Sequence, residues 1–184
     1  MTIKYFLLIS FGLLFFKPLV AQQDSVTIRG IYVAVIENYY KAKHENLTVI
    51  DTTVNHYIYQ TDFNQIADRF HDPVPPLLVD VESMDTSWIR TFREAEKNKS
   101  ILHEKRIPHF HVKSIKIQFV KKPIIINYGM IEKVTLSNVI IIGKRAIVEF
   151  NRISSGEDGM GILFVLEKCK GKWKVISQVQ TWIS

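Results

Sequence analysis

Residues 134–182 read VTLSNVIIIGKRAIVEFNRISSGEDGMGILFVLEKCKGKWKVISQVQTW, and they predict most of a β-sheet. This stretch contains four runs of the alternating or apolar kind that is typical of β-strands. These runs cover residues 134–142, 145–153, 161–167 and 173–182. Short connections that contain glycine separate most of them, and such connections indicate antiparallel hairpins. A further alternating run over residues 112–120 brings the predicted sheet to about five strands.

The preceding half of the chain has the spacing of helices. Apolar residues recur three and four apart over residues 28–39, which predicts a helix that ends by Asn46. A short strand is expected over residues 47–51. Two more helices are expected, one capped by Asp62 and one starting after Asp85. Their predicted inward residues are Phe63, Ile66, Ala67 and Phe70 in the first, and Trp88, Phe92 and Ala95 in the second.

Helices followed by strands predict an α+β fold, with N-terminal helices packed on one face of a curved antiparallel sheet. Residues 22–184 are expected to form a single domain, because 184 minus 21 leaves 163 residues, enough for one core. Trp173 and Trp182 on the last strand are expected to anchor that core. The chain has one cysteine, Cys169, so an intramolecular disulfide cannot form.

The first 21 residues have the composition of a secretory signal peptide. Lys4 precedes an apolar run over residues 5–16, Lys17 and Pro18 end the run, and Ala21 suits the position before a cleavage site. An uncleaved membrane anchor is the alternative, but a spanning helix needs about 20 apolar residues and this run is shorter. The sequence therefore predicts an exported protein, periplasmic or secreted, without a transmembrane segment in its mature part.

The mature chain carries a mild positive charge. Removing Lys4 and Lys17 lowers the 24 basic residues to 22 against 18 acids, so the net charge falls from +6 to +4. The basic residues are densest over 97–106 and 168–174, where no nucleic-acid-binding motif accompanies them. These stretches are expected to be solvated surface, and no nucleic-acid partner is predicted.

The C-terminal third carries a resemblance to known proteins. Residues 159–168 read GMGILFVLEK, residues 171–175 read GKWKV, and the chain ends in TWIS at 181–184. This pattern is similar to the end of many uncharacterised exported bacterial proteins with a G-x-G-x-L strand, an E-K-x-x-G-K-W hairpin and a terminal W-I-S. Many of them carry paired cysteines where this chain has residues 154–159. The resemblance implies a bacterial exported protein without an assigned activity.

A weaker likeness links the order of elements to the NTF2-like and cystatin-like cone folds, in which N-terminal helices wrap a curved antiparallel sheet. That likeness concerns the fold alone, because the active sites of those proteins differ from member to member. It transfers no catalytic or binding residue to this chain.

His109 and His111 are the residues with the best case for chemistry. On an unbroken strand they point the same way, about 6–7 Å apart, and could share a metal ion. A bulge near Lys113 would instead bury Phe110 and Val112 and leave both imidazoles in water. Two protein ligands do not complete a metal site. The sequence therefore predicts no metal, no cofactor and no catalytic residue.

Three functions follow as hypotheses. The first is a non-enzymatic exported domain that binds a small apolar ligand or a protein partner in the concavity between helices and sheet. The alternative is an enzyme of NTF2-like type with His109 or His111 as general base, with or without a metal. A structural component of the cell envelope is the third.

Export is directly testable at the N-terminus. We expect mass spectrometry of the native protein to find a mature chain that starts at or within a few residues of Gln22, because Ala21 is the small residue before the cut. Recovery of the intact chain with Met1 from the membrane fraction would contradict this prediction and favour the anchor.

Overall fold

The structure is a computed structural model that describes residues 25–41, 46–68, 70, 84–100, 102–121, 132–154 and 158–183. The expected signal peptide, residues 1–21, lies outside these ranges. A helix over residues 25–40 comes first, followed by α2 (His56–Gln60), α3 (Phe63–Asp68) and α4 (Trp88–Lys99). The strands are β1 (Asn46–Ile50), β2 (Lys116–Val120), β3 (Lys133–Leu136), β4 (Ile140–Ile142), β5 (Arg145–Ile153), β6 (Gly159–Cys169) and β7 (Lys172–Ile183).

The helices form where the apolar spacing predicts them. The N-terminal helix buries residues at positions 31, 32, 35, 36 and 40, and α4 buries Trp88, Phe92 and Ala95 as expected. Asp62 caps α3, since its Oδ1 accepts a hydrogen bond from the Gln65 backbone N–H at 3.0 Å. The sequence pattern gave no sign of α2. No helix in the described part of the chain is long and apolar enough to cross a membrane.

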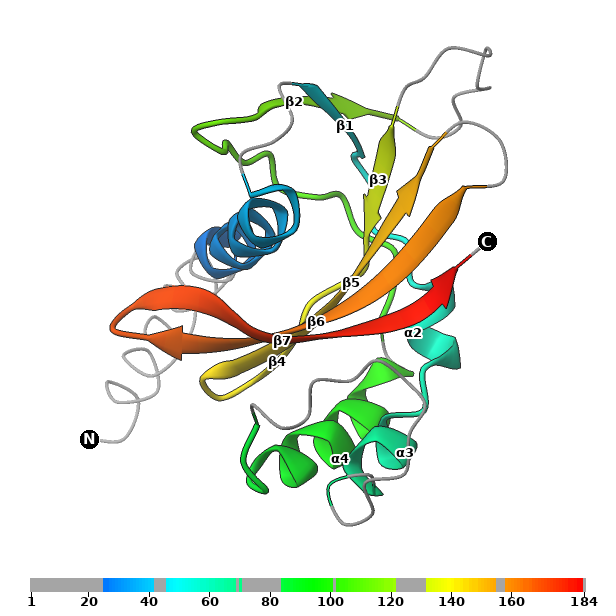
Figure 1. The fold of residues 1–184 in the computed structure, drawn as a ribbon, viewed down its shortest axis with the longest axis vertical. Coiled ribbons are helices and arrows are strands. Elements are labelled where there is room, and N and C mark those ends of the chain that lie inside the picture. Colours follow the sequence, from blue (N-terminus) through cyan, green and yellow to red (C-terminus); the bar gives the residue numbers. More distant parts are fainter. Residues whose placement is uncertain are drawn as a thin grey trace, which may run out of the picture.

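The chain has the predicted α+β composition, but its sheet differs from the expected one. Seven strands form an open, mixed sheet in the order β2-β1-β3-β5-β6-β7, with β4 paired to β5 (Figure 1). Strand β1 runs parallel to both β2 and β3, whereas β3 to β7 pair in antiparallel fashion. The predicted number of about five strands was therefore too low, and the predicted antiparallel direction is correct for the pairs among β3 to β7 but wrong for the pairs that β1 makes with β2 and β3.

A single serine explains one of the extra strands. The predicted run over residues 134–142 divides into β3 and β4 at Ser137, which is fully buried. The Ser137 carbonyl accepts a hydrogen bond from the Tyr32 hydroxyl at 3.0 Å. The Glu149 N–H of β5 donates to the Ser137 hydroxyl oxygen at 2.9 Å. Because the side chain accepts the N–H of the neighbouring strand, regular strand geometry stops there.

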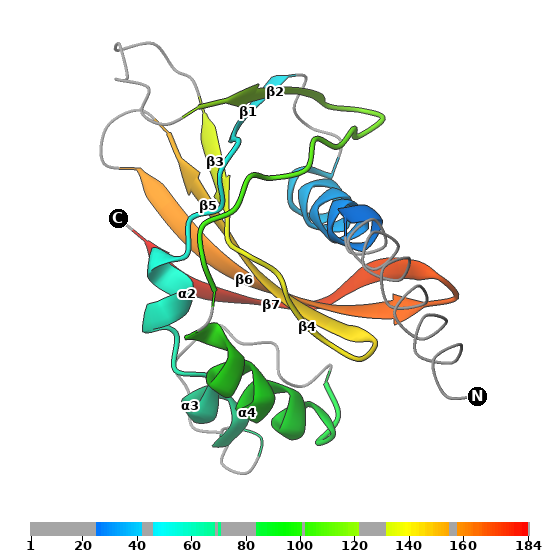
Figure 2. The same ribbon diagram turned by 180° about the vertical axis from the view of Figure 1, so that it is seen from behind.

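Helices cover both faces of the sheet, which corrects the expectation of one covered face (Figures 1 and 2). Alternate side chains of β5 and β6 enter two different cores. Val148 and Phe164 pack on the side of the N-terminal helix, whereas Ile147, Leu163 and Val165 pack on the side of α3 and α4. Strands buried on both faces read as continuous apolar runs, as residues 162–166 do.

Two tight hairpins join the last four strands, as the glycine-containing connections predicted. Lys170 and Gly171 link β6 to β7 with φ values of 49° and 82°, a pair of positive values that fits a type I′ turn. Gly143 has a φ of 62° between β4 and β5, where the first turn residue must be left-handed. Both turns lie at the same end of the sheet, where the Lys168 N–H donates to the Lys144 carbonyl, and Figure 2 shows the β6–β7 hairpin beside the N-terminal helix.

Candidate functional site

The two histidines do not form a site in the described part of the chain. Val112 and Ile115 form a bridge around a turn, so regular strand pairing begins at Lys116 rather than at residue 112. The structure therefore matches the second expectation, in which a break near Lys113 buries Val112 and leaves both imidazoles in water. His109 and His111 are both exposed, and the His109 ring stacks on Phe119 with a centroid separation of 4.3 Å.

Metal binding finds no support among the described residues. Across those ranges, no group of three His, Cys, Asp or Glu side chains is close enough to hold an ion. His103, upstream of the pair, is exposed as well. The histidine pair therefore stays a surface feature next to strand β2.

A groove of about 420 Å³ lies between the end of the N-terminal helix and strands β6 and β7. Asn38, Tyr39 and Lys41 line it from the helix, and Ile162 lines it from β6. Residues 175–178 of β7 form the opposite wall. The groove is the concavity between helix and sheet that the sequence analysis anticipated, although its position at β7 was not predicted.

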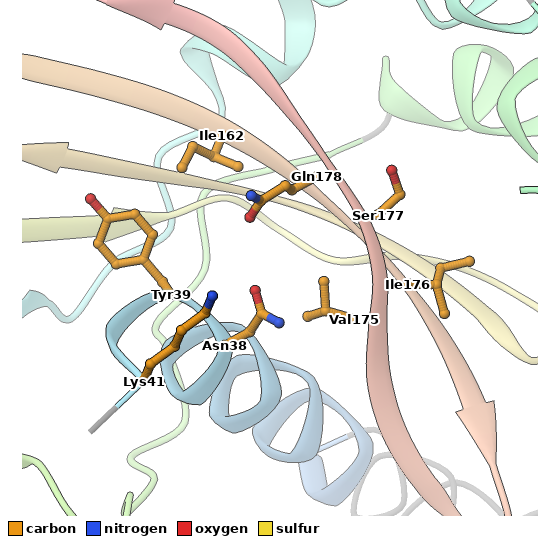
Figure 3. A pocket seen from close by; sticks show the side chains of 8 residues that line it. All are labelled: Asn38, Tyr39, Lys41, Ile162, Val175, Ile176, Ser177 and Gln178. Atoms are coloured by element: carbon orange, nitrogen blue, oxygen red, sulfur yellow. The ribbon is translucent and has the colours of Figure 1, made fainter. Parts of the chain in front are cut away.

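Figure 3 shows how the lining side chains are arranged. The polar ends of Asn38, Lys41 and Gln178 point toward the same space, with Val175 beside them. Ile176 points away from the groove. The groove thus combines hydrogen-bonding groups with an apolar wall, and the residues lining it include one cation and no acid.

Lys41 reaches the groove through an unusual backbone conformation. It follows the last turn of the helix, where its N–H donates to the Glu37 carbonyl at 3.1 Å, and its φ is 44°. Glycine is the usual residue at this left-handed position, and another residue there costs on the order of 1–3 kcal/mol. The cation also lies at the negative end of the helix dipole, which stabilises it.

A second polar cluster is buried in the sheet on the side of α3 and α4. Glu149 on β5 has no exposed surface, and its Oε1 accepts a hydrogen bond from the Thr181 hydroxyl of β7 at 3.1 Å. Asn151, two residues along β5, accepts a hydrogen bond from Trp182 Nε1 at 2.8 Å. Both bonds pass over the intervening strand β6.

Gly161 on β6 makes these two contacts possible. The pairing shifts from Gly161–Trp182 to Ile162–Gln180, so β7 carries one extra residue, Thr181, in a bulge. A Cβ atom added at Gly161 would lie 2.2 Å from Trp182 Nε1 and 2.5 Å from Thr181 Oγ1. Only glycine therefore leaves room for both β7 side chains above β6.

Burial dominates the chemistry of Glu149. It raises the pKa of the carboxyl from 4.5 to about 8, with the hydrogen bond from Thr181 acting in the opposite direction. Glu149 Oε2 has no hydrogen-bond partner among the described residues, and the same holds for Asn151 Nδ2 and Asn55 Nδ2. A buried carboxyl in this setting stays protonated at neutral pH. Glu149 is not among the residues that line the groove.

The Glu149 cluster was not predicted from the sequence, although the sequence contains a signal for it. Within the apolar strand 145–150, Glu149 stands between Val148 and Phe150, where a charge is unexpected on a strand with two buried faces.

The expected roles of the two tryptophans hold only in part. Trp182 is half-buried and bonded to Asn151, and Trp173 is half-buried against the helix at Gly30.

Comparison with known proteins adds no functional information to either feature. No protein-family model matches this chain, and neither a curated protein nor a solved structure is significantly similar to it. The chemistry of the groove and of the Glu149 cluster is therefore argued from their own geometry.

The raised pKa of Glu149 predicts that stability falls as pH rises. Between about pH 4.5 and 8 the folded chain keeps a proton that the unfolded chain releases. The free energy of unfolding should thus decrease by up to about 1.4 kcal/mol for each pH unit in this window. Glu149→Gln cannot titrate, so urea unfolding of that variant should show a flatter pH dependence than the wild type.

Glu94→Gln is the matched control, because Glu94 lies on the outer side of α4 in an ion pair with Arg90 at 2.8 Å. It should keep the slope of the wild type. An unchanged slope in Glu149→Gln would show that this carboxyl ionises normally in the folded chain.

Proposed function

We propose that the chain is an exported domain that binds a small amphipathic organic anion in the groove between its N-terminal helix and β7. The observation that carries the proposal is the convergence of Lys41, Asn38 and Gln178 beside an apolar wall (Figure 3). The volume of about 420 Å³ lies within the range of about 300–1,000 Å³ that is common for sites of small ligands.

The lining selects the chemistry of the ligand. Asn38 and Gln178 can each donate and accept hydrogen bonds, while Lys41 is a donor with a positive charge. A carboxylate, phosphate or sulfonate head would match these donors, and an apolar body would pack against Ile162 and Val175. The ring of Tyr39 adds an aromatic side to the same space. The lining is more polar than a purely apolar ligand requires.

The conformation of Lys41 supports the same conclusion. Strained backbone positions are retained where the surrounding structure imposes them, and they cluster at ligand-binding sites. The left-handed Lys41 places a cation at the edge of the groove, where glycine would end the helix at a lower cost.

The wider setting of the proposal comes from the sequence. Export rests on the signal-peptide pattern of residues 1–21 and on the resemblance of the C-terminal hairpin to exported bacterial proteins. The likeness to NTF2-like or cystatin-like cone folds rests on the order of elements, helices before an antiparallel hairpin that carries the G-K-W sequence at residues 171–173. We rank an enzyme with His109 or His111 as base second, because both side chains are exposed and neither lines the groove.

Binding can be tested with a fluorescent amphipathic anion, anilinonaphthalene sulfonate, and with decanoate as competitor. We expect saturable binding of the dye, displacement by decanoate, and weaker displacement by decanol, which lacks the charge. Lys41→Asn tolerates the left-handed backbone but removes the charge, so the affinity for decanoate should fall by about tenfold, equivalent to about 1.4 kcal/mol.

Lys174→Gln is the control, because Lys174 is an exposed cation of the same strand β7 outside the groove lining. It should bind dye and decanoate like the wild type. Equal affinities of wild type and Lys41→Asn, or binding of the dye that does not saturate, would overturn the proposed function.

A further inference from the structure

The hairpin between β6 and β7 ends in a cluster of lysines. Lys170 lies in its two-residue turn, Lys168, Lys172 and Lys174 lie on the flanking strands, and all four are exposed. Lys144, in the neighbouring turn between β4 and β5, is also exposed, and its carbonyl accepts a hydrogen bond from the Lys168 N–H at 2.8 Å. Five cationic side chains thus project from one end of the sheet.

Few acidic groups oppose these cations. Glu167 is the last acid of β6, and its Oε1 lies 3.7 Å from Arg145 Nε, so this acid is paired with another cation. Glu37 of the N-terminal helix faces the hairpin across a second groove of about 350 Å³. Five lysines and Arg145 therefore share this end of the molecule with two acids paired to Arg145, Glu167 and Asp85, and with the exposed Glu37, so that its potential is positive.

The lysine tip lies beside the start of the N-terminal helix. The groove between them is lined by Val26 and Thr27 of the helix and by Gly171, Lys172 and Trp173 of the hairpin. Val26 is 64% exposed. In Figures 1 and 2 the hairpin extends along the helix toward the end where the chain enters it. Cationic, aromatic and apolar side chains are thus combined on one surface.

Before its cleavage, the expected signal peptide would hold this surface near a membrane. The apolar run of the expected signal peptide ends at Phe16, ten residues before Val26. Ten extended residues span at most about 35 Å. While the apolar run is inserted in a bilayer, this segment limits how far the start of the helix can move from the lipid headgroups. The lysine tip lies beside the start of the helix, so it stays close to the headgroups as well.

We propose that the β6–β7 lysine tip is a surface that binds anionic lipid headgroups of the membrane at which the chain is exported. Each lysine near an anionic bilayer contributes about 1 kcal/mol, so several together give measurable binding without an anchor. Val26 and the half-buried Trp173 supply the apolar contact that lysines alone lack. The surface is independent of the groove at Lys41, because no lysine of the tip lines that groove.

The test uses the chain from Gln22 onward, which contains every residue that the structure describes. Its binding is measured by co-sedimentation with vesicles of phosphatidylcholine alone and of phosphatidylcholine mixed with phosphatidylglycerol. The tip variant is Lys168→Gln/Lys172→Gln/Lys174→Gln, which leaves the left-handed Lys170 in place. The control variant removes three exposed cations next to and within strand β2, Lys113→Gln/Lys116→Gln/Lys121→Gln.

We expect wild type and control to bind the anionic vesicles with affinities within about threefold of each other, and the tip variant to bind about 100-fold more weakly. Added salt should weaken the binding of the wild type to anionic vesicles, and the wild type should not bind to vesicles of phosphatidylcholine alone. Melting temperatures of both variants check that the fold is intact, and the tip variant should still bind the dye in the groove. Equal losses in the two variants, no loss in the tip variant, or binding of a soluble polyanion such as heparin without binding to vesicles would each overturn the proposal.

Discussion

Strand β6 packs against helices through both of its faces, and this packing determines how the other elements are placed. Phe164 points into the core with the N-terminal helix, while Leu163 and Val165 point into the core with α3 and α4. All three side chains have no exposed surface. Each helical layer covers only one face of β6. Removing either layer would therefore expose apolar side chains of β6 to water.

The same packing explains where polar chemistry occurs. On β5 and β6 a polar residue must find a partner inside the sheet, and Glu149 and Asn151 find theirs in Thr181 and Trp182 across Gly161. Burying a carboxyl in this way costs stability unless it keeps its proton. Strand β7 is at the edge of the sheet and pairs only with β6. The groove with Lys41 and the lysine tip both lie along this edge strand. The interior of the sheet thus contains the buried carboxyl of Glu149, whereas the two proposed binding surfaces lie at the edge and at one end of the sheet.

Local patterns predicted much of the fold because they depend on neighbouring residues. The helical stripe of α4, the cap at Asp62 and the hairpin at Lys170–Gly171 follow from spacing and turn preferences. The parallel pairing of β1 with β2 and β3 depends on contacts between distant segments, which no local pattern encodes. Ser137 divides a predicted strand where its hydroxyl accepts the Glu149 N–H of β5 and its carbonyl accepts the hydroxyl of Tyr32, 105 residues away. The groove was anticipated as a concavity, but its position required the helix and β7 to be placed together.

Burial of β6 on both faces can be tested by truncating two adjacent side chains of that strand. The side chains of Leu163 and Phe164 point to opposite cores. Urea unfolding of Leu163→Ala and Phe164→Ala gives the free energy of unfolding that each variant loses. We expect losses of about 2–5 kcal/mol for Leu163→Ala and about 3–5 kcal/mol for Phe164→Ala. A loss below about 1 kcal/mol in either variant would contradict burial on both faces, because one face of β6 would then be open to solvent.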